Sequence, residues 1–222
     1  MNGYLNGAVG AVAPLHLRRR VVTTLLQINA SLNNGNGQSS QLANQFVAAF
    51  QRSHPGTKIL KRDVAAADPV PHLDGERFGA LIAKPEERTV AQHAVVAYSD
   101  NLIDELKQAD VILLGLPMYN FGVPSQLKAY FDHIARVGIT FKYTDKGSVG
   151  LLTGKKAFVF AARGGLYVGT PLDTQTSYVR DFLRFLGIAD VEFVYAEGLN
   201  ISPQSKEAGL AKALAEIARL AA

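Results

Sequence analysis

The sequence contains no cysteine, and it contains no long hydrophobic run. Without cysteine the chain cannot form disulfides, thiolate metal sites, iron–sulfur clusters or a cysteine nucleophile. The absence is compatible with a reducing compartment, and we expect a cytoplasmic protein. No apolar run approaches the roughly 20 residues that a membrane-spanning helix needs, so no membrane association is expected.

Acidic residues are also missing from the first part of the chain, because residues 1–62 contain no Asp or Glu. Residues 1–20 have a short apolar middle followed by arginines, which reverses the order of a secretory signal peptide. An organellar presequence remains an alternative, but this tract is poorly amphipathic. We therefore expect residues 1–20 to be a loose N-terminal extension and residues 21–222 to form a single domain.

The charge balance of the whole chain is weakly basic, with a formal net charge of +4 over 222 residues. No basic run is interleaved with aromatic residues, as stacking platforms for nucleic acid would require. We therefore expect no nucleic-acid partner, although the positive excess could help to gather anionic ligands.

Short apolar runs alternate along the chain with stretches of helical periodicity. The apolar runs predict strands at 21–28, 57–63, 110–116, 156–162 and 191–196. The periodic stretches predict one helix that starts at Ser39 and four more at 89–107, 124–135, 172–186 and 204–221. Strands that are apolar on both faces indicate a parallel sheet covered on both sides. The fold class predicted is an α/β doubly wound five-stranded parallel sheet with helices on both faces. Segments 64–88 and 136–155 lack clear periodicity and are either functional or mobile.

Ligands of such folds bind outside the carboxyl ends of the strands, where three predicted loops have unusual composition. The first loop, residues 29–40, offers hydroxyls, amides and glycines before a helix, which suits a phosphate group. It matches neither the dinucleotide pattern nor the Walker A pattern, so a single terminal phosphate is favoured over a pyrophosphate. A plain polar turn, with Ser39 or Ser40 capping the helix, is the alternative.

The second loop, residues 117–123, carries Met118, Tyr119, Asn120 and Phe121 in a row. The two aromatic residues are too bulky for a tight turn but flat enough to line a planar ligand. The Asn120 amide offers a donor and an acceptor together, as the edge of a heterocycle requires. The alternative is that the aromatic residues only close the end of the sheet.

The third loop, residues 162–171, begins with Ala162 and then Arg163, Gly164 and Gly165. Glycines allow a ligand to approach the backbone, and the arginine could stabilise negative charge. A common turn is the alternative.

Other chemistries find no support in the sequence. There is no G-x-S-x-G motif for a serine nucleophile, and the five histidines are scattered without an H-E-x-x-H pattern. A metal site is therefore not expected. A chain without acid–base machinery of its own suggests that a bound cofactor carries the reaction.

With "PMYNF" at 117–121, "RGG" at 163–165 and "NGNGQSSQL" at 34–42, the sequence resembles the FMN-dependent NADH:quinone oxidoreductase and azoreductase family. "LDGERFGAL" at 73–81 and "ITFKYTDKG" at 139–147 extend the likeness, which runs from about residue 21 to the C-terminus. The resemblance implies a flavodoxin-like fold and an FMN cofactor.

The resemblance also implies roles for individual residues. It implies that the phosphate is held by Ser31, Gly37, Gln38 and Ser39. The isoalloxazine ring would be bordered by Met118, Tyr119, Asn120 and Phe121. The pyrimidine side of the ring would be closed by Ala162, Arg163, Gly164 and Gly165. Arg163 would stabilise the reduced flavin. Gly37 and Ala162 stand where relatives often have serine, which implies weaker retention of FMN.

For function, the resemblance implies that NADH or NADPH reduces the flavin and that a quinone or azo compound then takes two electrons at the same ring face, in ping-pong order. It implies a homodimer, with Tyr143 and Phe185 as candidates for the apolar wall over the flavin. Two alternatives remain: a flavodoxin-like electron carrier, and a regulatory FMN-binding or nucleic-acid-binding protein without substrate turnover. Electron carriers of this fold are usually small and acidic, whereas this chain is basic.

Overall fold

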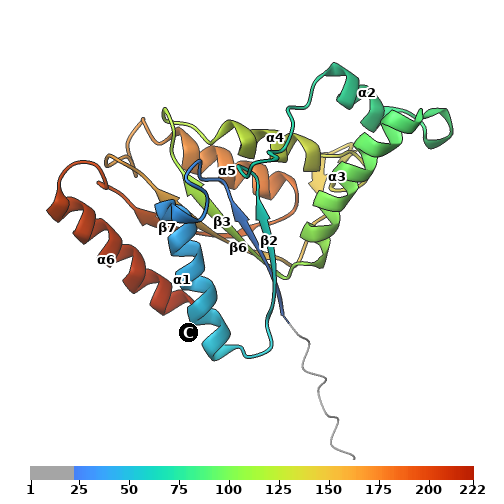
Figure 1. The fold of residues 1–222 in the computed structure, drawn as a ribbon. Coiled ribbons are helices and arrows are strands. Elements are labelled where there is room, and N and C mark those ends of the chain that lie inside the picture. Colours follow the sequence, from blue (N-terminus) through green and yellow to red (C-terminus); the bar gives the residue numbers. More distant parts are fainter. Residues whose placement is uncertain (1–22) are drawn as a thin grey trace, which may run out of the picture.

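The computed structural model describes residues 23–222 (Figure 1). The expected extension at residues 1–20 lies outside this range, so it stays a prediction together with the single-domain organisation. The strands of the main sheet are β1 (Thr24–Asn29), β2 (Lys58–Asp63), β3 (Val111–Pro117), β6 (Lys156–Ala162) and β7 (Asp190–Ala196). The helices are α1 (Gln38–Ser53), α2 (Gly75–Ile82), α3 (Val90–Gln108), α4 (Ser125–Ile134), α5 (Thr174–Phe185) and α6 (Pro203–Leu220).

The five strands of the main sheet are parallel and lie in the order β2-β1-β3-β6-β7. This is the flavodoxin-like order of a doubly wound sheet, which confirms the predicted fold class. Pairing sets Pro117 opposite Ala162, and Ala162 opposite Ala196. The loops that follow β3, β6 and β7 therefore leave the sheet at the same level.

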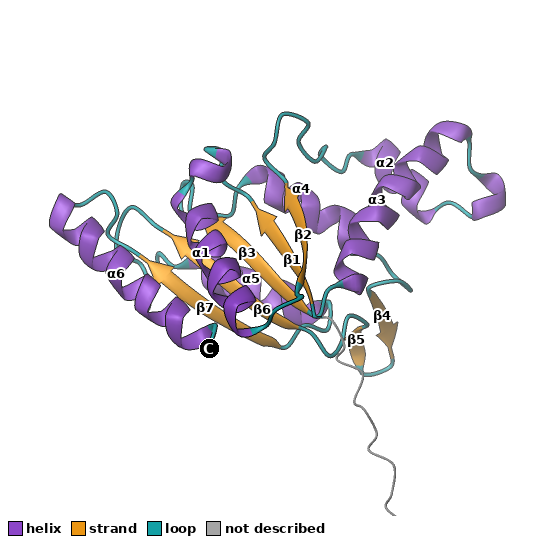
Figure 2. Ribbon diagram, turned by 60° about the horizontal axis from the view of Figure 1, so that its bottom comes forward, coloured by secondary structure: helices purple, strands orange, loops and turns teal. Residues whose placement is uncertain are grey.

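Helices cover both faces of the sheet, and each face has its own hydrophobic cluster (Figure 2). One cluster joins α1 and α6 to strand residues such as Leu113 and Phe160. The other joins α3, α4 and α5 to the alternate strand residues, such as Leu114 and Val159. Successive side chains of a strand point to opposite faces, so a strand covered on both sides must be apolar at every position. This is the pattern from which the strands were predicted.

The two segments without periodicity contain structure that the sequence pattern did not reveal. Segment 64–88 contains α2, whose first turn is capped by the Asp74 carboxylate accepting a hydrogen bond from the Arg77 amide. Segment 136–155 contains an antiparallel hairpin of β4 (Phe141–Thr144) and β5 (Gly147–Gly150). Both elements are shorter than the windows over which periodicity can be recognised.

Candidate functional site

A cleft of about 170 Å³ opens at the carboxyl ends of β1, β3 and β6, between the three loops selected from the sequence. It is lined by Ser31, Asn33, Gly37, Gln38, Ser39, Pro117, Met118, Tyr119, Ala162, Arg163, Gly164, Leu199, Asn200 and Lys206. Of the residues expected to hold FMN, only Asn120, Phe121 and Gly165 are not part of this lining; Asn120 and Gly165 adjoin lining residues in the chain, and Phe121 does not. The structure therefore brings the three loops together around one space.

The first loop leads directly into α1, whose N-cap is Gly37. No side chain caps this helix, so the expected role of Ser39 or Ser40 as a cap is wrong. Both serines lie inside the first turn, fully buried, and their hydroxyls have no hydrogen-bond partner among the described residues. Free first-turn amides and an unpartnered Ser39 hydroxyl on the cleft are suitable donors for a phosphate.

Gly37 is required by its contact with Ser31. A Cβ atom at position 37 would lie 2.0 Å from Ser31 Oγ and 2.5 Å from Ser31 Cβ. A serine at position 37 would therefore displace the Ser31 side chain from the cleft instead of simply adding a second hydroxyl.

The second loop is a tight turn, which corrects the expectation that its aromatic residues exclude one. The amides of Tyr119 and Gly122 each donate to the other residue's carbonyl, at 3.2 and 3.0 Å. The two central residues both have positive φ, 49° for Asn120 and 66° for Phe121. Asparagine tolerates this conformation, but for phenylalanine it is strained, by about 1–3 kcal/mol.

Two residues at the start of α5 stabilise the strained turn. Thr174 Oγ1 donates to the Phe121 carbonyl at 2.5 Å, and Gln175 Nε2 donates to the carbonyls of Pro117 and Gly122 at 2.9 and 3.1 Å. The Gln175 side chain is buried. Sequence reasoning missed both residues, because nothing in the sequence indicates which backbone carbonyls a distant helix will contact.

Tyr119 connects the second loop to the first. Its hydroxyl accepts a hydrogen bond from the Leu32 amide at 3.1 Å and lies 3.5 Å from Ser31 Oγ. Tyr119 therefore fixes the separation of the loops that follow β1 and β3.

The Arg163 side chain neither faces solvent nor presents a free charge to the cleft. It is fully buried, and its guanidinium pairs with Asp173 at 2.9 Å and with Glu197 at 3.3 Å. It also donates to Thr176 Oγ1 at 2.9 Å. A cation between two carboxylates has its charge already balanced, so this geometry does not support the expected role of Arg163 as a counter-ion for reduced flavin.

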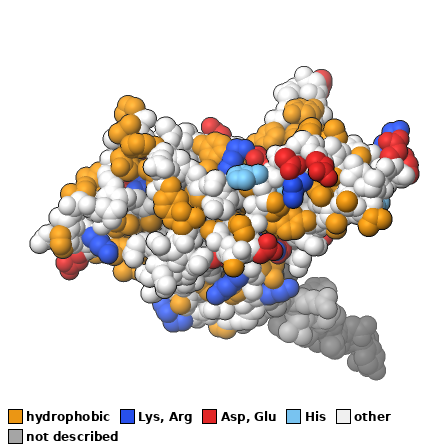
Figure 3. All heavy atoms as spheres, turned by 45° about the horizontal axis from the view of Figure 1, so that its top comes forward, with side chains coloured by type: hydrophobic (Ala, Val, Ile, Leu, Met, Phe, Trp, Pro, Cys, Tyr) orange, Lys and Arg blue, Asp and Glu red, His pale blue; other side chains and the backbone are white. Residues whose placement is uncertain are grey.

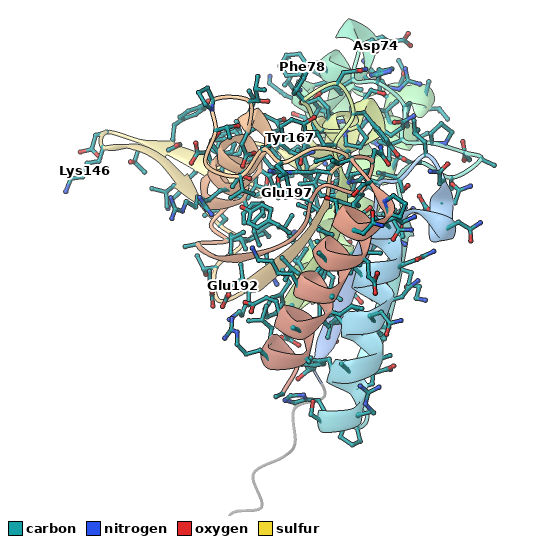
Figure 4. All side chains as sticks on the ribbon, turned by 90° about the vertical axis from the view of Figure 1, so that its left-hand side faces the viewer. Asp74, Phe78, Lys146, Tyr167, Glu192 and Glu197 are labelled. Carbon is teal, nitrogen blue, oxygen red and sulfur yellow. The ribbon has the colours of Figure 1, made fainter. Side chains whose placement is uncertain are left out.

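The buried arginine instead holds the third loop in place. Glu197 Oε1 also accepts hydrogen bonds from the amides of Tyr167 and Val168, at 2.8 and 3.0 Å, and Figure 4 shows Glu197 close to Tyr167. Asp173 caps α5 by accepting from the Thr176 amide. Burial alone would raise the pKa of Asp173, but hydrogen bonds from Arg163 and Thr176 outweigh it and keep the pKa below its ordinary value.

Gly164 contacts Asn200, on the loop that follows β7. A Cβ atom on Gly164 would lie 2.8 Å from Asn200 Nδ2, so a larger residue at this position would displace the Asn200 side chain. The amides of Leu199 and Asn200 donate to the carbonyls of Arg163 and Gly164, at 3.1 and 3.0 Å. Asn200 and Lys206 line the cleft and were missed from the sequence, since neither belongs to a recognisable motif.

Tyr143 and Phe185 do not line the cleft of their own chain. Both contact Phe141, with ring centroids 5.5 and 4.3 Å apart. Phe185 ends α5, whose 12 residues span about 17 Å from the end that contacts the second loop. Figure 4 shows Lys146, at the tip of the β4–β5 hairpin, projecting away from the body of the molecule. Within one chain, these two aromatic residues therefore lie far from the three loops.

Metal ligands do not gather anywhere in the described chain, where no three His, Asp or Glu side chains are close enough to hold an ion. His133 is buried, and its Nε2 lies 3.0 Å from the Pro71 carbonyl. Burial lowers the pKa of this imidazole. It is a packed residue. No helix among residues 23–222 is long and apolar enough to span a membrane.

Exposed hydrophobic side chains lie on the loops at the cleft's end of the sheet. The exposed apolar residues on the loops at this end of the sheet include Leu32, Phe121, Leu166, Val168, Leu172 and Ile201. In Figure 3 hydrophobic side chains are exposed at the upper left of the molecule and also at its centre and upper right. A polar cleft with an apolar rim suits a ligand with an anionic end and a flat aromatic end.

The comparison with known proteins agrees with this geometry. Residues 23–221 match a protein family described as having a flavodoxin-like fold. The chain is 55% identical over 191 residues to the FMN-dependent NADH:quinone oxidoreductase of Cellvibrio japonicus, covering 86% of this chain and 96% of the relative. It is 53% identical over 197 residues to FMN-dependent NADH:quinone oxidoreductase 6 of Burkholderia lata, covering 89% and 99%.

Solved structures agree with the sequence relatives. An azoreductase from Bacillus anthracis superposes with a TM-score of 0.82 at 28% identity, covering 90% of this chain and 99% of that one. An FMN-dependent NADH-azoreductase of the same species, solved in complex with FMN, gives a TM-score of 0.80 at 27% identity, covering 90% and 100%. The chain belongs to the family of FMN-dependent NADH:quinone oxidoreductases and azoreductases with a flavodoxin-like fold.

Proposed function

We propose that this protein is an FMN-dependent oxidoreductase that uses NADH or NADPH to reduce quinones and azo compounds. The observation that carries the proposal is the single cleft into which the Ser31–Ser39 loop, the Met118–Phe121 turn and the Ala162–Gly165 segment all converge. The residues also fit FMN physically. The phosphate end offers an unpartnered buried hydroxyl at Ser39 and an uncapped helix start, and the rim offers apolar and aromatic surface.

The residues of this chain would bind and orient the cofactor. Ser31, Gln38 and Ser39, with the first amides of α1, would hold the phosphate. Met118 and Ala162 would border the ring from two neighbouring strands, which are joined where the Met118 amide donates to the Ala162 carbonyl at 3.1 Å. When bound, FMN supplies the two-electron chemistry, accepting a hydride from the reduced nicotinamide and passing two electrons to the quinone or azo acceptor.

A ping-pong order follows if donor and acceptor use the same face of the ring. The apolar rim residues, such as Leu32 and Leu166, would exclude water and contact the flat part of either partner. No nucleophile or acid–base residue of the chain is needed for this exchange.

We further propose a homodimer in which Tyr143 and Phe185 of one subunit reach the cleft of the other. This is supported by their distance from the cleft of their own chain and by the 70% exposure of Tyr143. Light scattering would give the mass of the particle in solution. A monomer of 23.9 kDa would contradict the proposal.

Stopped-flow spectroscopy under anaerobic conditions tests the activity. We expect NADH to bleach the visible absorbance of the flavin and a quinone to restore it. Initial rates should give parallel double-reciprocal lines. Slow or absent bleaching would favour an electron carrier or a regulatory protein. The same experiment with NADPH determines the donor preference, and cell fractionation tests the expected cytoplasmic location.

A further inference from the structure

Lys206 lines the cleft but belongs to α6 and to none of the three loops. It lies in the second turn of α6, after the Ser202 cap and Pro203, and it is exposed. Its neighbours Ser205 and Glu207 are not part of the lining. Helical side chains point back toward the N-terminus of their helix. The Lys206 side chain, and not the helix backbone, therefore reaches the cleft.

The position of α6 beside the cleft is fixed by close packing. A Cβ atom on Gly209 would lie 2.2 Å from the Glu197 carbonyl oxygen, so only glycine lets this helix approach the end of β7 so closely. Helix α6 also packs against α1, whose N-terminus forms the phosphate end of the cleft. The second turn of α6 and the first turn of α1 are thereby held on the same face of the sheet.

The ammonium group of Lys206 has no acidic partner. The ion pairs formed among residues 23–222 do not include it. One turn away on α6, in either direction, stand Ser202, Pro203, Gly209 and Leu210, none of which is acidic. The cleft lining contains no Asp or Glu, and its other cation, Arg163, is balanced by two carboxylates. Lys206 is therefore the one unbalanced charge of the described cleft lining.

The phosphate end of the cleft has no cation of its own, because residues 23–51 contain no Lys or Arg. A phosphate monoester carries a charge of about −1.5 to −2 at pH 7. Helix amides and serine hydroxyls supply hydrogen bonds and partial charge, but no full positive charge. Resting on the proposed function, we propose that Lys206 binds the phosphate of FMN as its counter-ion and so sets the affinity of the protein for the phosphorylated flavin.

Comparison of FMN with riboflavin tests this proposal without measuring activity. Flavin fluorescence quenching gives the dissociation constant of each. We expect Lys206→Ala to weaken FMN binding about 5- to 30-fold, as for a charge-assisted contact at a solvent-accessible site, and to leave riboflavin binding unchanged within twofold. The decrease of FMN affinity between about 20 and 500 mM NaCl should also become shallower, because exposed ion pairs are screened by salt.

Two matched variants separate the charge from the rest of the side chain. Lys206→Arg should retain most of the FMN affinity. Lys212→Ala, on the same helix but outside the cleft, should change neither dissociation constant. An equal loss of FMN and riboflavin binding in Lys206→Ala, or no loss of either, would overturn the proposal. So would an unchanged FMN affinity with a raised KM for NADH, which would assign Lys206 to the nicotinamide donor.

These outcomes are distinct from a failure of the proposed function. If the wild-type protein binds FMN and riboflavin but its flavin is not reduced by NADH, the proposed oxidoreductase activity is wrong. The proposed role of Lys206 is then still decided by the binding data. If the wild-type protein binds no FMN, both proposals fail.

Discussion

The two ends of the cleft are built in opposite ways. At the ring end, the Arg163 guanidinium is fully buried, and several hydrogen bonds join it to Asp173, Thr176 and Glu197. At the phosphate end, the Ser39 hydroxyl is buried without a partner, and no side chain caps α1. The charges at the ring end are balanced within the protein itself, although Arg163 Nε is buried without a hydrogen-bond partner, whereas the phosphate end has hydroxyl donors that a ligand would satisfy.

The difference suggests what each end contributes. A charge-balanced network rigidifies the loops that carry it, and here it joins Arg163 to Asp173 and Glu197. An unsatisfied buried hydroxyl costs stability, which a binding site can bear when a ligand recovers the cost. We therefore expect substitutions at the ring end to affect stability first and substitutions at the phosphate end to affect FMN affinity first.

The largest effect is expected for Arg163→Ala. Removal of the guanidinium would leave two carboxylates partly buried without a counter-charge, which typically costs about 3–5 kcal/mol of unfolding free energy. Urea denaturation of the FMN-free protein measures it. Arg219→Ala, which removes an exposed arginine paired with Glu216, is the control and should leave the midpoint unchanged. An unchanged midpoint for Arg163→Ala would show that the buried network does not stabilise the fold.

Next in size is Asn120→Ala, at the turn between the two ends. Loss of the amide should weaken FMN binding by about 1–3 kcal/mol if it contacts the ring edge. Alanine at a φ of 49° also strains the turn, by about 1 kcal/mol relative to glycine. Asn120→Gly separates the two effects, because it removes the amide without the strain. Equal FMN affinity in the wild type and Asn120→Gly would remove Asn120 from the cofactor site.

Ser39→Ala should give opposite effects on stability and affinity. Removing a buried hydroxyl without a partner should raise the unfolding free energy of the FMN-free protein by about 1 kcal/mol and weaken FMN binding about tenfold. Ser40→Ala is the matched control: its hydroxyl is also buried and unpartnered, but Ser40 does not line the cleft. It should gain stability without losing affinity. A loss of stability in Ser39→Ala would contradict the comparison of the two ends.

Most of the fold was predictable because its signal is local. The strands of a covered parallel sheet are apolar at every position, and their helices show a regular period, so five strands and five helices could be placed to within a few residues. The missed elements, α2 and the β4–β5 hairpin, are too short to show a period. The three loops of the cleft were also predictable, since the carboxyl ends of parallel strands converge.

The residues that support the cleft could not be predicted, because their partners are distant in sequence. Gln175 contacts the carbonyl of Pro117, 58 positions away, and Glu197 contacts the amide of Tyr167, 30 positions away. The burial of Arg163 could not be predicted either, since a charged residue between a strand and two glycines shows no sign of being buried. Packing of α6 against β7 brings Lys206 to the cleft, and no local pattern reports such packing.

The smallest expected effects are those of pH, to which the two ends of the cleft should respond in different ranges. The folded-state pKa of Asp173 lies below its ordinary value of about 3.9. Its contribution to stability is therefore fully present above about pH 4 and is lost as the pH falls through the lower folded-state value. The difference in unfolding free energy between the wild type and Asp173→Asn should be constant above about pH 5 and shrink below about pH 4.

FMN affinity should respond at a higher pH, because the second ionisation of a phosphate monoester lies near pH 6. The cleft lining contains no carboxylate that titrates with it. Titration of FMN binding from pH 8 to pH 5 should therefore show weaker binding below about pH 6, where the fold has not begun to lose the contribution of Asp173. Riboflavin, which has no phosphate, should bind equally over this range. If FMN and riboflavin affinities fell together with the stability of the fold, the two ends would not be independent and the comparison between them would be wrong.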